Sequence, residues 1–553
     1  MTAAPRRWER SGRALALGLL LAPVMPWGAA SAAADAAAQG QAQAPTAPTA
    51  PTAPAAPAAS TAALPASEWR VTEEHWYVLS LDGQPCGWMR SEEAASADGS
   101  RRRQVSESLM RLSRGGQPVE VEVRSAFEET PRGQPIRCEV RQRSGDQPIE
   151  QWFLFDPATP ERIRVGARQG GREKIDTMPA PPPGWLAPMA AEAFAQERRS
   201  AGAREFRVRT VEPQSGMREM EVVNTLLGES TFQLGDRTVP VTRWKVQNSL
   251  VPLPTEEEWS GDGVLVRSRT TMALGVVEAV LSGRQQALAA GRGAAPVELM
   301  ARTLVKPDRS IPGFLRLREA VFRVRGRDGS LADLPSCGAQ RVSRVDAGTM
   351  DVEVRVDAPA EATAAELADE RYRRPSVVID SDDAQVKALA ERALSGVPEG
   401  APALARAEAL RRAVAAHVTR KDLRSAFASA SETVRSHEGD CTEHAVLLAA
   451  LLRSSGIPSR VATGLVYADR FAGQRDIFAW HMWTQALFDG RWVDLDATLP
   501  ASGPRHHAAH LCTGTSAQEQ GSMDVEWAAL AGMIGNLQVE VLRLDGEGAK
   551  GTP

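Results

Sequence analysis

The chain has no marked excess of charge of either sign. Its 553 residues include 65 Lys and Arg against 69 Asp and Glu, so the net charge is −4 and the pI is about 6.2. Proteins that bind nucleic acid or anionic membrane surfaces usually carry a clear positive excess, which is missing here. We therefore expect no nucleic-acid partner.

Long apolar runs are also scarce. One run, from Ala14 to about Pro26, follows four arginines and precedes small residues that include Ala30-Ser31-Ala32. This order is typical of a cleavable secretory signal, so we read residues 1–32 as a signal peptide. An uncleaved anchor is the alternative, but the run is shorter than the ~20 residues that span a bilayer. We expect an exported protein, periplasmic or secreted, with no transmembrane helix after signal removal.

Cysteine is rare, and no Cys-x-x-Cys pair of the kind that binds structural zinc occurs. The five cysteines are Cys86, Cys138, Cys337, Cys441 and Cys512. Because the number is odd, at least one thiol is left over from disulfide pairing. If the four cysteines other than Cys441 paired, three connectivities would be possible, and the sequence does not choose among them. We read those four as structural or paired.

The length predicts two to four domains, since single cores stop growing at roughly 250 to 300 residues. Residues 33–67 form a Pro/Ala/Thr linker with almost nothing to bury. Alternating apolar and polar residues then predict an antiparallel, β-rich domain over 68–296, with one helix near 188–201. A small β domain, or an extension of the first, follows over 297–360. This region contains no chemical constellation, and we interpret it as a scaffold or substrate-docking sheet.

Residues 361–515 form a third region, in which the apolar period becomes helical. Ser381 is placed as the N-cap of a helix that ends near Gly396, and a second amphipathic helix is expected over 403–418. Their apolar stripes predict packing on a core. Residues 516–553 are read as a C-terminal tail that packs back as a helix and a strand.

A helix that begins at Cys441 is the most informative feature of the third region. Asp440 and Glu443 stand in the spacing of a capping box, and the helix is expected to run to about Ser454. Cys441 then lies in the first turn, where the helix dipole and backbone N–H groups favour thiolate over thiol. The body of the helix is apolar all round, which predicts a buried, rigid mount for the sulfur.

Two alternating segments flank Asp489-Gly490, the strongest short signal for a two-residue hairpin. In that register His481 and Asp496 share a face as diagonal neighbours, within reach of an imidazole–carboxylate hydrogen bond. Asp494 shares the face but lies one pair further from His481. Geometry therefore favours Asp496 as the carboxylate that orients the imidazole. The preceding residues, 468–478, are interpreted as a loop.

Four motifs occur in order: Gly-Asp-Cys, Leu-Arg-x-x-Gly-Ile-Pro-x-Arg, Trp-His-x-Trp-Thr and Trp-Val-Asp-Leu-Asp. Together, over about 377–500, they resemble the core of the transglutaminase-like superfamily, whose fold is related to papain-type cysteine proteases. The resemblance implies an α+β fold with a helix-mounted Cys packed on an antiparallel sheet, preceded by the β-rich region. It implies Cys441 as nucleophile, His481 as base and Asp496 as third member. Ala497 departs from the Pro that often follows this Asp.

The resemblance implies a cysteine enzyme that acts on protein or peptide amide bonds through a thioester. Transfer to water gives a peptidase or amidase, and transfer to an amine gives a cross-linker. Such a mechanism requires no cofactor and no metal. No Trp or Gln upstream of Cys441 stands out as an oxyanion donor. The alternative function is a non-catalytic envelope scaffold or binding protein that retains the fold.

The remaining histidines are given structural interpretations. A zinc site could be built from His437, Cys441 and His444 with the nearby His506, His507 and His510, but three residues around one helix start cannot easily face one ion. His444 is read as a packing residue. The His-His-Ala-Ala-His cluster at 506–510 is read as part of a solvated tail.

Overall fold

The computed structural model describes residues 69–546, except 115, 145–147, 252, 273, 294–295, 299, 421–427 and 520–531. The predicted signal peptide and the predicted linker lie outside these residues, as does much of the helix expected in the C-terminal tail. Within the described part of the chain, no helix combines the length and the apolar character needed to cross a bilayer. The fold is mixed α+β, as the sequence predicted.

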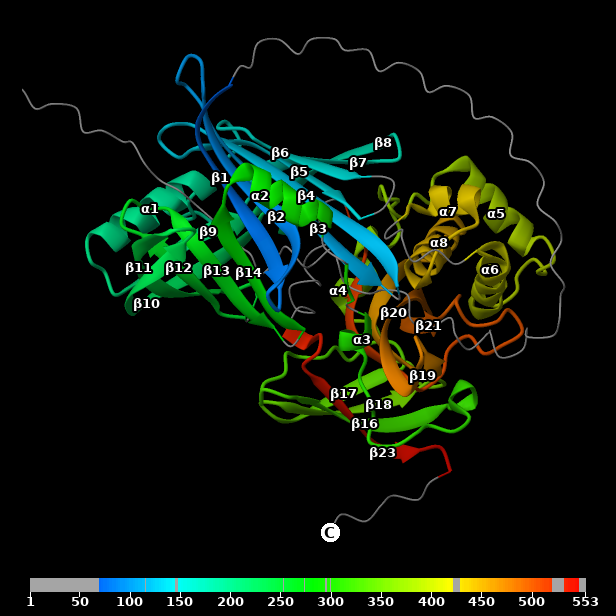
Figure 1. Ribbon diagram of the computed structural model, residues 1–553. Helices are drawn as coiled ribbons and strands as arrows, with labels where there is room; N and C mark the ends of the chain where they lie inside the picture. The colour runs from blue at the N-terminus through cyan, green and yellow to red at the C-terminus, as the bar shows by residue number, and fades with distance from the viewer. Residues whose placement is uncertain are drawn as a thin grey trace, which may run out of the picture.

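A large sheet forms the N-terminal half and is drawn from blue to green in Figure 1. Its strand order is β8-β7-β6-β5-β4-β3-β2-β1-β14-β13-β12-β11-β10-β9, with antiparallel neighbours, and β15 pairs in parallel with β3. The strands are β1 (Trp69–Leu81), β2 (Gln84–Ser96), β3 (Arg102–Arg114), β4 (Gln117–Glu129), β5 (Pro135–Arg143), β6 (Ile149–Phe155), β7 (Arg162–Gln169), β8 (Arg172–Pro179), β9 (Glu205–Glu212), β10 (Arg218–Leu234), β11 (Arg237–Asn248), β12 (Thr255–Ser260), β13 (Leu265–Met272), β14 (Gly275–Ser282) and β15 (Val297–Glu298).

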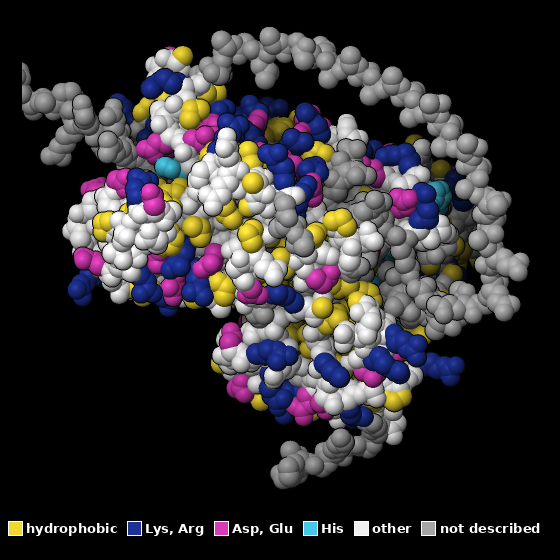
Figure 2. Space-filling model, in the orientation of Figure 1, with side chains coloured by type: hydrophobic (Ala, Val, Ile, Leu, Met, Phe, Trp, Pro, Cys, Tyr) yellow, Lys and Arg dark blue, Asp and Glu magenta, His cyan; other side chains and the backbone are white. Residues whose placement is uncertain are grey.

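Alternation along these strands separates a buried face from a charged one. The inward residues form several apolar clusters, among them one that contains Tyr77 and Trp244 and one that contains Phe127 and Phe153. Helix α1 (Pro188–Ser200) lies where the sequence predicted a helix, and α2 (Arg284–Gly293) also packs on the sheet. In Figure 2, Lys/Arg and Asp/Glu side chains intermix over this half of the molecule. The surface visible there matches the balanced charge of the sequence.

A second sheet has the order β17-β18-β16-β23 and is built from distant parts of the chain. Its strands are β16 (Glu319–Gly326), β17 (Gln340–Asp346), β18 (Thr349–Arg355) and β23 (Leu537–Leu544). Strand β23 pairs antiparallel with β16, from Ala320 opposite Leu544 to Gly326 opposite Leu537. The chain therefore completes this small sheet only after it has passed through the helical region, and the strand expected in the C-terminal tail is its edge.

In the third region, the helices α5 to α8 pack with an antiparallel sheet of order β21-β20-β19-β22. These elements are α5 (Ala384–Leu394), α6 (Ala403–His417), α7 (Ala430–Ser436), α8 (Cys441–Ser454), β19 (Ser459–Phe471), β20 (Gln474–Phe488), β21 (Arg491–Leu495) and β22 (His510–Ser516). The short elements that come after the large sheet and before α5 are α3 (Met300–Thr303), η5 (Phe314–Arg316), α4 (Ala364–Ala368) and η6 (Glu370–Tyr372). One more short element, η4 (Pro213–Ser215), lies between β9 and β10 of the large sheet.

Two local predictions for this region were wrong. The N-cap of α5 is Asp383, whose carboxylate accepts from the N–H groups of Gln385 and Val386, and not Ser381. Residues 468–478, expected to be a loop, continue β19 and β20 around a tight turn at Ala472-Gly473. The first error arose because a second polar residue close by, Asp383, satisfies the same capping signal.

Helix α8 is the buried centre of this region. From Ala445 to Leu452, each side chain is at most 2% exposed. Figure 1 shows α8 between α5, α6 and α7 and the strands β19 and β20. A helix that is apolar all round is stable only when it is enclosed in this way, as its sequence predicted. The packing holds the first turn of α8 in a fixed place against the sheet.

Candidate active site

Cys441 is the first residue of α8, and its side chain is 3% exposed. The predicted capping box is present on both sides of it. The Thr442 N–H donates to Oδ1 of Asp440 at 2.8 Å, and the Asp440 N–H donates to Oε2 of Glu443 at 2.9 Å. These two hydrogen bonds fix the start of the helix, and with it the position of the thiol, in the way that capping boxes do.

Glu443 also joins the capping box to a segment outside the helix. Its Oε1 accepts from the Ala428 N–H at 3.1 Å, and the side chain is fully buried. Burial and the neighbouring Asp440 raise the pKa of Glu443 well above its usual value. Glycine is required at 439, because a Cβ there would lie 2.3 Å from the Cβ of Glu443.

His481 and Asp496 form a buried hydrogen bond. The hairpin has the predicted register, with Phe488 opposite Arg491, and the ladder ends at the pair Thr484 and Leu495. Asp496 then leaves the strand and places Oδ2 2.9 Å from Nε2 of His481. Asp494, the other candidate, does not contact His481 in this way. The sequence-based choice of Asp496 as the carboxylate next to the imidazole thus agrees with the geometry.

The other oxygen of Asp496 is held by the turn that follows. Oδ1 accepts from the N–H and the hydroxyl of Thr498, at 2.8 and 2.7 Å. Burial acts to raise the pKa of Asp496, but His481 and His510 outweigh it and hold the pKa well below the usual range. Asp496 is therefore a carboxylate with fixed orientation.

Helix α8 packs against β20, the strand that carries His481. The Thr484 hydroxyl on β20 donates to the Ala445 carbonyl of α8 at 2.9 Å, which joins the two elements one helical turn after Cys441. Burial lowers the pKa of His444 in the first turn, and the charges of Asp496 and His481 also act on it. Among the described residues, Nδ1 of His481 has no hydrogen-bond partner.

Arg411, which the sequence analysis did not select, supports the segment after Asp496. Its side chain lies on α6, is 1% exposed, and points its guanidinium at main-chain carbonyls. The acceptors, at 3.2 to 3.5 Å, are the carbonyls of Asp496, Leu499, Pro500, Ala501 and Gly503. Burial lowers the pKa of Arg411. One arginine thus holds together the turn that carries the carboxylate.

The prediction that the histidines at 506–510 belong to a solvated tail was wrong. His506, His507 and His510 are at most 2% exposed. His510 begins β22, and pairing of β22 with β19 brings it beside the site. Its Nε2 lies 3.2 Å from Oδ2 of Asp496 and its Nδ1 lies 3.0 Å from the His507 carbonyl oxygen. Two imidazoles therefore share one carboxylate oxygen.

Asp494 connects the site to the small sheet. Its Oδ1 accepts from Nε1 of Trp483 and Nε2 of Gln485, both at 2.7 Å. Its Oδ2 accepts from the Ala339 N–H, also at 2.7 Å. Asp494 thereby uses both of its carboxylate oxygens. One of its donors is Trp483, whose ring stacks on His481 with centroids 6.1 Å apart.

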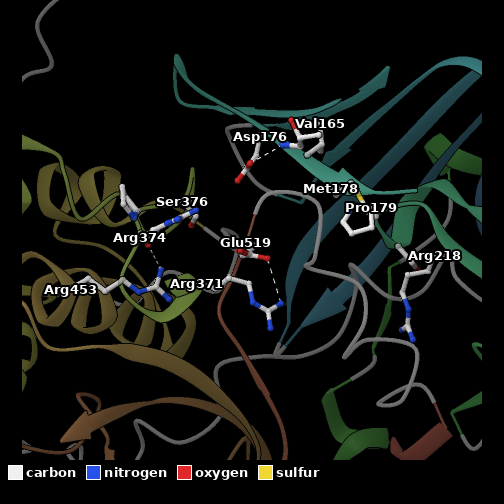
Figure 3. A pocket seen from close by; sticks show the side chains of 14 residues that line it. Val165, Asp176, Met178, Pro179, Arg218, Arg371, Arg374, Ser376, Arg453 and Glu519 are labelled. Carbon is white, nitrogen blue, oxygen red and sulfur yellow. Dashed lines mark hydrogen bonds and ion pairs between the residues drawn. The ribbon is translucent and has the colours of Figure 1, made fainter. Parts of the chain in front are cut away.

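A cavity of about 510 Å³ lies elsewhere, between the N-terminal sheet and the helical region. Figure 3 shows Asp176 and Met178 approaching it from β8, and Arg374 and Arg453 from the other side. Arg453 is in the last turn of α8, about 18 Å from Cys441 along the axis at about 1.5 Å per residue. This cavity is therefore not a pocket for groups that react at Cys441.

A cysteine at the start of a buried helix, packed on an antiparallel sheet that carries a His–Asp pair, has the arrangement of papain-related folds. Residues 387–497 match the model of the transglutaminase-like superfamily. The matched stretch includes Cys441, His481 and Asp496. This part of the chain is a transglutaminase-like core domain.

Two solved structures are similar to parts of the chain. One, described as a candidate cysteine protease from Cytophaga hutchinsonii, has 14% identity and a TM-score of 0.25, and the match covers 40% of this chain and 83% of that one. The other, a candidate protease from Parabacteroides distasonis, has 10% identity and a TM-score of 0.16, with 67% and 68% covered. A comparison with curated proteins gave no match.

Proposed function

We propose that the protein is a cysteine-dependent enzyme that cleaves or transfers carboxamide groups of proteins or peptides through a thioester on Cys441. The observation that carries this proposal is the 2.9 Å hydrogen bond from His481 Nε2 to Asp496, which leaves Nδ1 of the same ring without a hydrogen-bond partner among the described residues, on a strand that packs against α8. A thiol on a helix start, an imidazole and an orienting carboxylate are the parts of a thiol-based acyl-transfer site.

In the proposed reaction, Cys441 begins as thiolate and His481 as imidazolium. The sulfur attacks the carboxamide carbon, a C–S bond forms, and the C–N bond breaks as His481 gives its proton to the departing amine. Water or a primary amine then attacks the thioester and loses a proton to His481, and the thiolate leaves. Asp496 keeps Nε2 protonated, which directs Nδ1 to the proton transfers.

The first turn of α8 supplies the electrostatic part of this proposal. The N-terminal end of a helix carries partial positive charge, which favours both the thiolate and the oxyanion that develops on the attacked carbonyl. The burial of His481 and Asp496, at 0% and 1% exposure, keeps their interaction in a medium of low dielectric.

Alkylation of Cys441 by iodoacetamide tests the proposal. We expect fast alkylation near neutral pH, faster than for an ordinary thiol, and loss of that speed in His481→Gln. The exposed His437→Gln is the matched control and should react as the unmodified protein does. Slow alkylation that His481→Gln does not change would instead favour a non-catalytic scaffold that retains the fold.

A pool of glutamine-bearing peptides, incubated with and without a primary amine, distinguishes the reaction types by mass spectrometry. Cleavage indicates a peptidase, loss of ammonia with gain of water indicates an amidase, and a mass gain only with the amine indicates a cross-linker. Cys441→Ala should abolish whichever product forms, whereas Cys86→Ala, a buried cysteine of the N-terminal sheet, should not. Product formation by Cys441→Ala would overturn the proposal.

We also propose that the protein is exported and acts in the periplasm or outside the cell. The support is the order of basic, apolar and small residues in the first 32 positions. Fractionation of the native host, with mass spectrometry of the mature N-terminus, tests this point. A cytoplasmic protein that still begins at Met1 would contradict it.

A further inference from the structure

We propose that His481, Asp496 and His510 form a binding site for a divalent transition-metal cation, Zn²⁺ by preference. The donor atoms of these three residues lie within 4.8 Å of one another, and all three side chains are buried. Two imidazole nitrogens and one carboxylate oxygen suit zinc and its neighbours rather than magnesium or calcium.

The hydrogen bonding of His510 points to a cation. Both ring nitrogens of His510 face acceptors, since Nδ1 lies 3.0 Å from the His507 carbonyl oxygen and Nε2 lies 3.2 Å from Oδ2 of Asp496. A neutral imidazole has one N–H and satisfies only one of these contacts, so the other needs a positive charge, either a proton that makes His510 an imidazolium or a metal cation in its place. When Nδ1 donates to the carbonyl, Nε2 turns a lone pair toward a carboxylate, and a cation between the two removes the repulsion.

The surroundings of the site resemble the supporting shell of metal centres. Metal-bound histidines usually donate their second ring N–H to a carbonyl or a carboxylate, as His510 does to His507. The carboxylate is likewise held from behind, where Thr498 donates twice to Oδ1 of Asp496 and leaves Oδ2 for the cation.

His506 encloses the site on the side of His510. Its side chain is 2% exposed, and its ring centroid lies 4.1 Å from that of His510 with the ring planes 32° apart. His506 is not in the group of residues whose ligand atoms lie within 4.8 Å of one another. It therefore packs against the ligand His510 and is not itself a ligand.

The metal site overlaps the proposed reaction site, so occupancy has a functional consequence that depends on the proposed function. A cation bound to Nε2 of His481 displaces the proton that Asp496 holds there, and releases it to solvent. His481 then has no imidazolium form to protonate the leaving amine. We infer that Zn²⁺ inhibits the enzyme reversibly and that a chelator restores it.

Binding is tested in the full mature protein that carries Cys441→Ala, so that neither catalysis nor that thiol contributes. Calorimetric titration with ZnCl₂ should give one site of micromolar or tighter affinity with proton release. Affinity should fall more than about 100-fold in His510→Gln. His437→Gln, an exposed histidine, should leave it unchanged. Mg²⁺ should not bind.

X-ray absorption of the zinc-loaded protein keeps the test decisive if His510→Gln does not fold. The proposal expects nitrogen and oxygen neighbours at about 2.0 to 2.1 Å, whereas sulfur neighbours at about 2.3 Å would place the ion on cysteine and overturn it. Absence of binding, or unchanged affinity in a folded His510→Gln, would also overturn it. Zinc binding without any measurable activity would refute the proposed function and leave the metal site standing.

Discussion

The sulfur atoms of Cys337 and Cys512 lie 3.3 Å apart in a buried cluster with Ala462 and Trp483. Cys337 precedes β17 of the small sheet, and Cys512 is in β22 of the core sheet. Cys86 and Cys138, by contrast, belong to two different apolar clusters of the N-terminal sheet. Of the pairings that the sequence left open, the geometry favours Cys337 with Cys512.

Oxidation should therefore join Cys337 to Cys512. The two thiols lose two protons and two electrons to a thiol–disulfide exchange partner, and the bond closes a loop of 175 residues. In the chain-entropy account, such a loop stabilises the fold by about 5 kcal/mol. Titration of thiols in the denatured protein should find five when reduced and three after oxidation. A linked peptide pair that contains Cys86 or Cys138 instead would contradict this assignment.

Gly439→Ala should weaken the start of α8. The added Cβ would stand 2.3 Å from the Cβ of Glu443, so the capping box must shift. We expect a loss of about 1 to 3 kcal/mol in the free energy of unfolding, as for overpacked cores, and slower alkylation of Cys441. Gly396→Ala is the control, because no atom lies within 4 Å of its added Cβ. Equal urea midpoints for the two variants would show that the capping box tolerates the change.

Arg411→Met should destabilise the turn after Asp496. It removes a buried charged donor from five main-chain carbonyls, and we expect a loss of roughly 3 to 5 kcal/mol. Activity should fall further than stability accounts for, because Asp496 loses its fixed position. Arg412→Met, on the exposed side of α6, should change stability by no more than about 0.5 kcal/mol. Urea unfolding and turnover at a temperature where both variants are folded provide the comparison.

Glu212→Gln should stabilise the N-terminal sheet at alkaline pH. Burial raises the pKa of Glu212 from 4.5 to about 7. Below pH 4.5 both the folded and the unfolded chain hold the proton. As the pH rises from 4.5 to about 7 only the unfolded chain loses it, so the stability of the natural protein falls.

The Glu212→Gln variant has no carboxyl group at this position, so its stability lacks this dependence on pH. It should match the natural protein near pH 4.5 and exceed it by up to about 3 kcal/mol at pH 8. Glu205→Gln, an exposed carboxylate on the same strand, should show no pH-dependent gain. Chemical unfolding at the two pH values measures the difference, and a gain that is equal at both would show that ionisation of Glu212 is not its source.

Short sequence patterns predicted those features of the site that depend on residues close together in the chain, namely the capping box of α8 and the hairpin that carries His481. Asp440 and Glu443 sit three residues apart, and Asp489-Gly490 fixes the register that brings Asp496 to His481. His510 was missed because its place depends on β22 pairing with β19, a relation between distant strands that has no local pattern. Arg411 was missed because it occupies a position on an otherwise ordinary amphipathic helix, and only the folded turn shows what it binds.

The pairing of β16 with β23 sets an order for biosynthesis. Residues of β16 leave the ribosome long before those of β23, and until the last strand arrives β16 is an open edge of the small sheet. Unpaired edges recruit other chains, and the alternating Arg323 and Arg325 on β16 are the kind of charged side chain that discourages this. A nascent chain cut short before Leu537 would expose that edge permanently, so loss of the last 17 residues should cause aggregation out of proportion to their number.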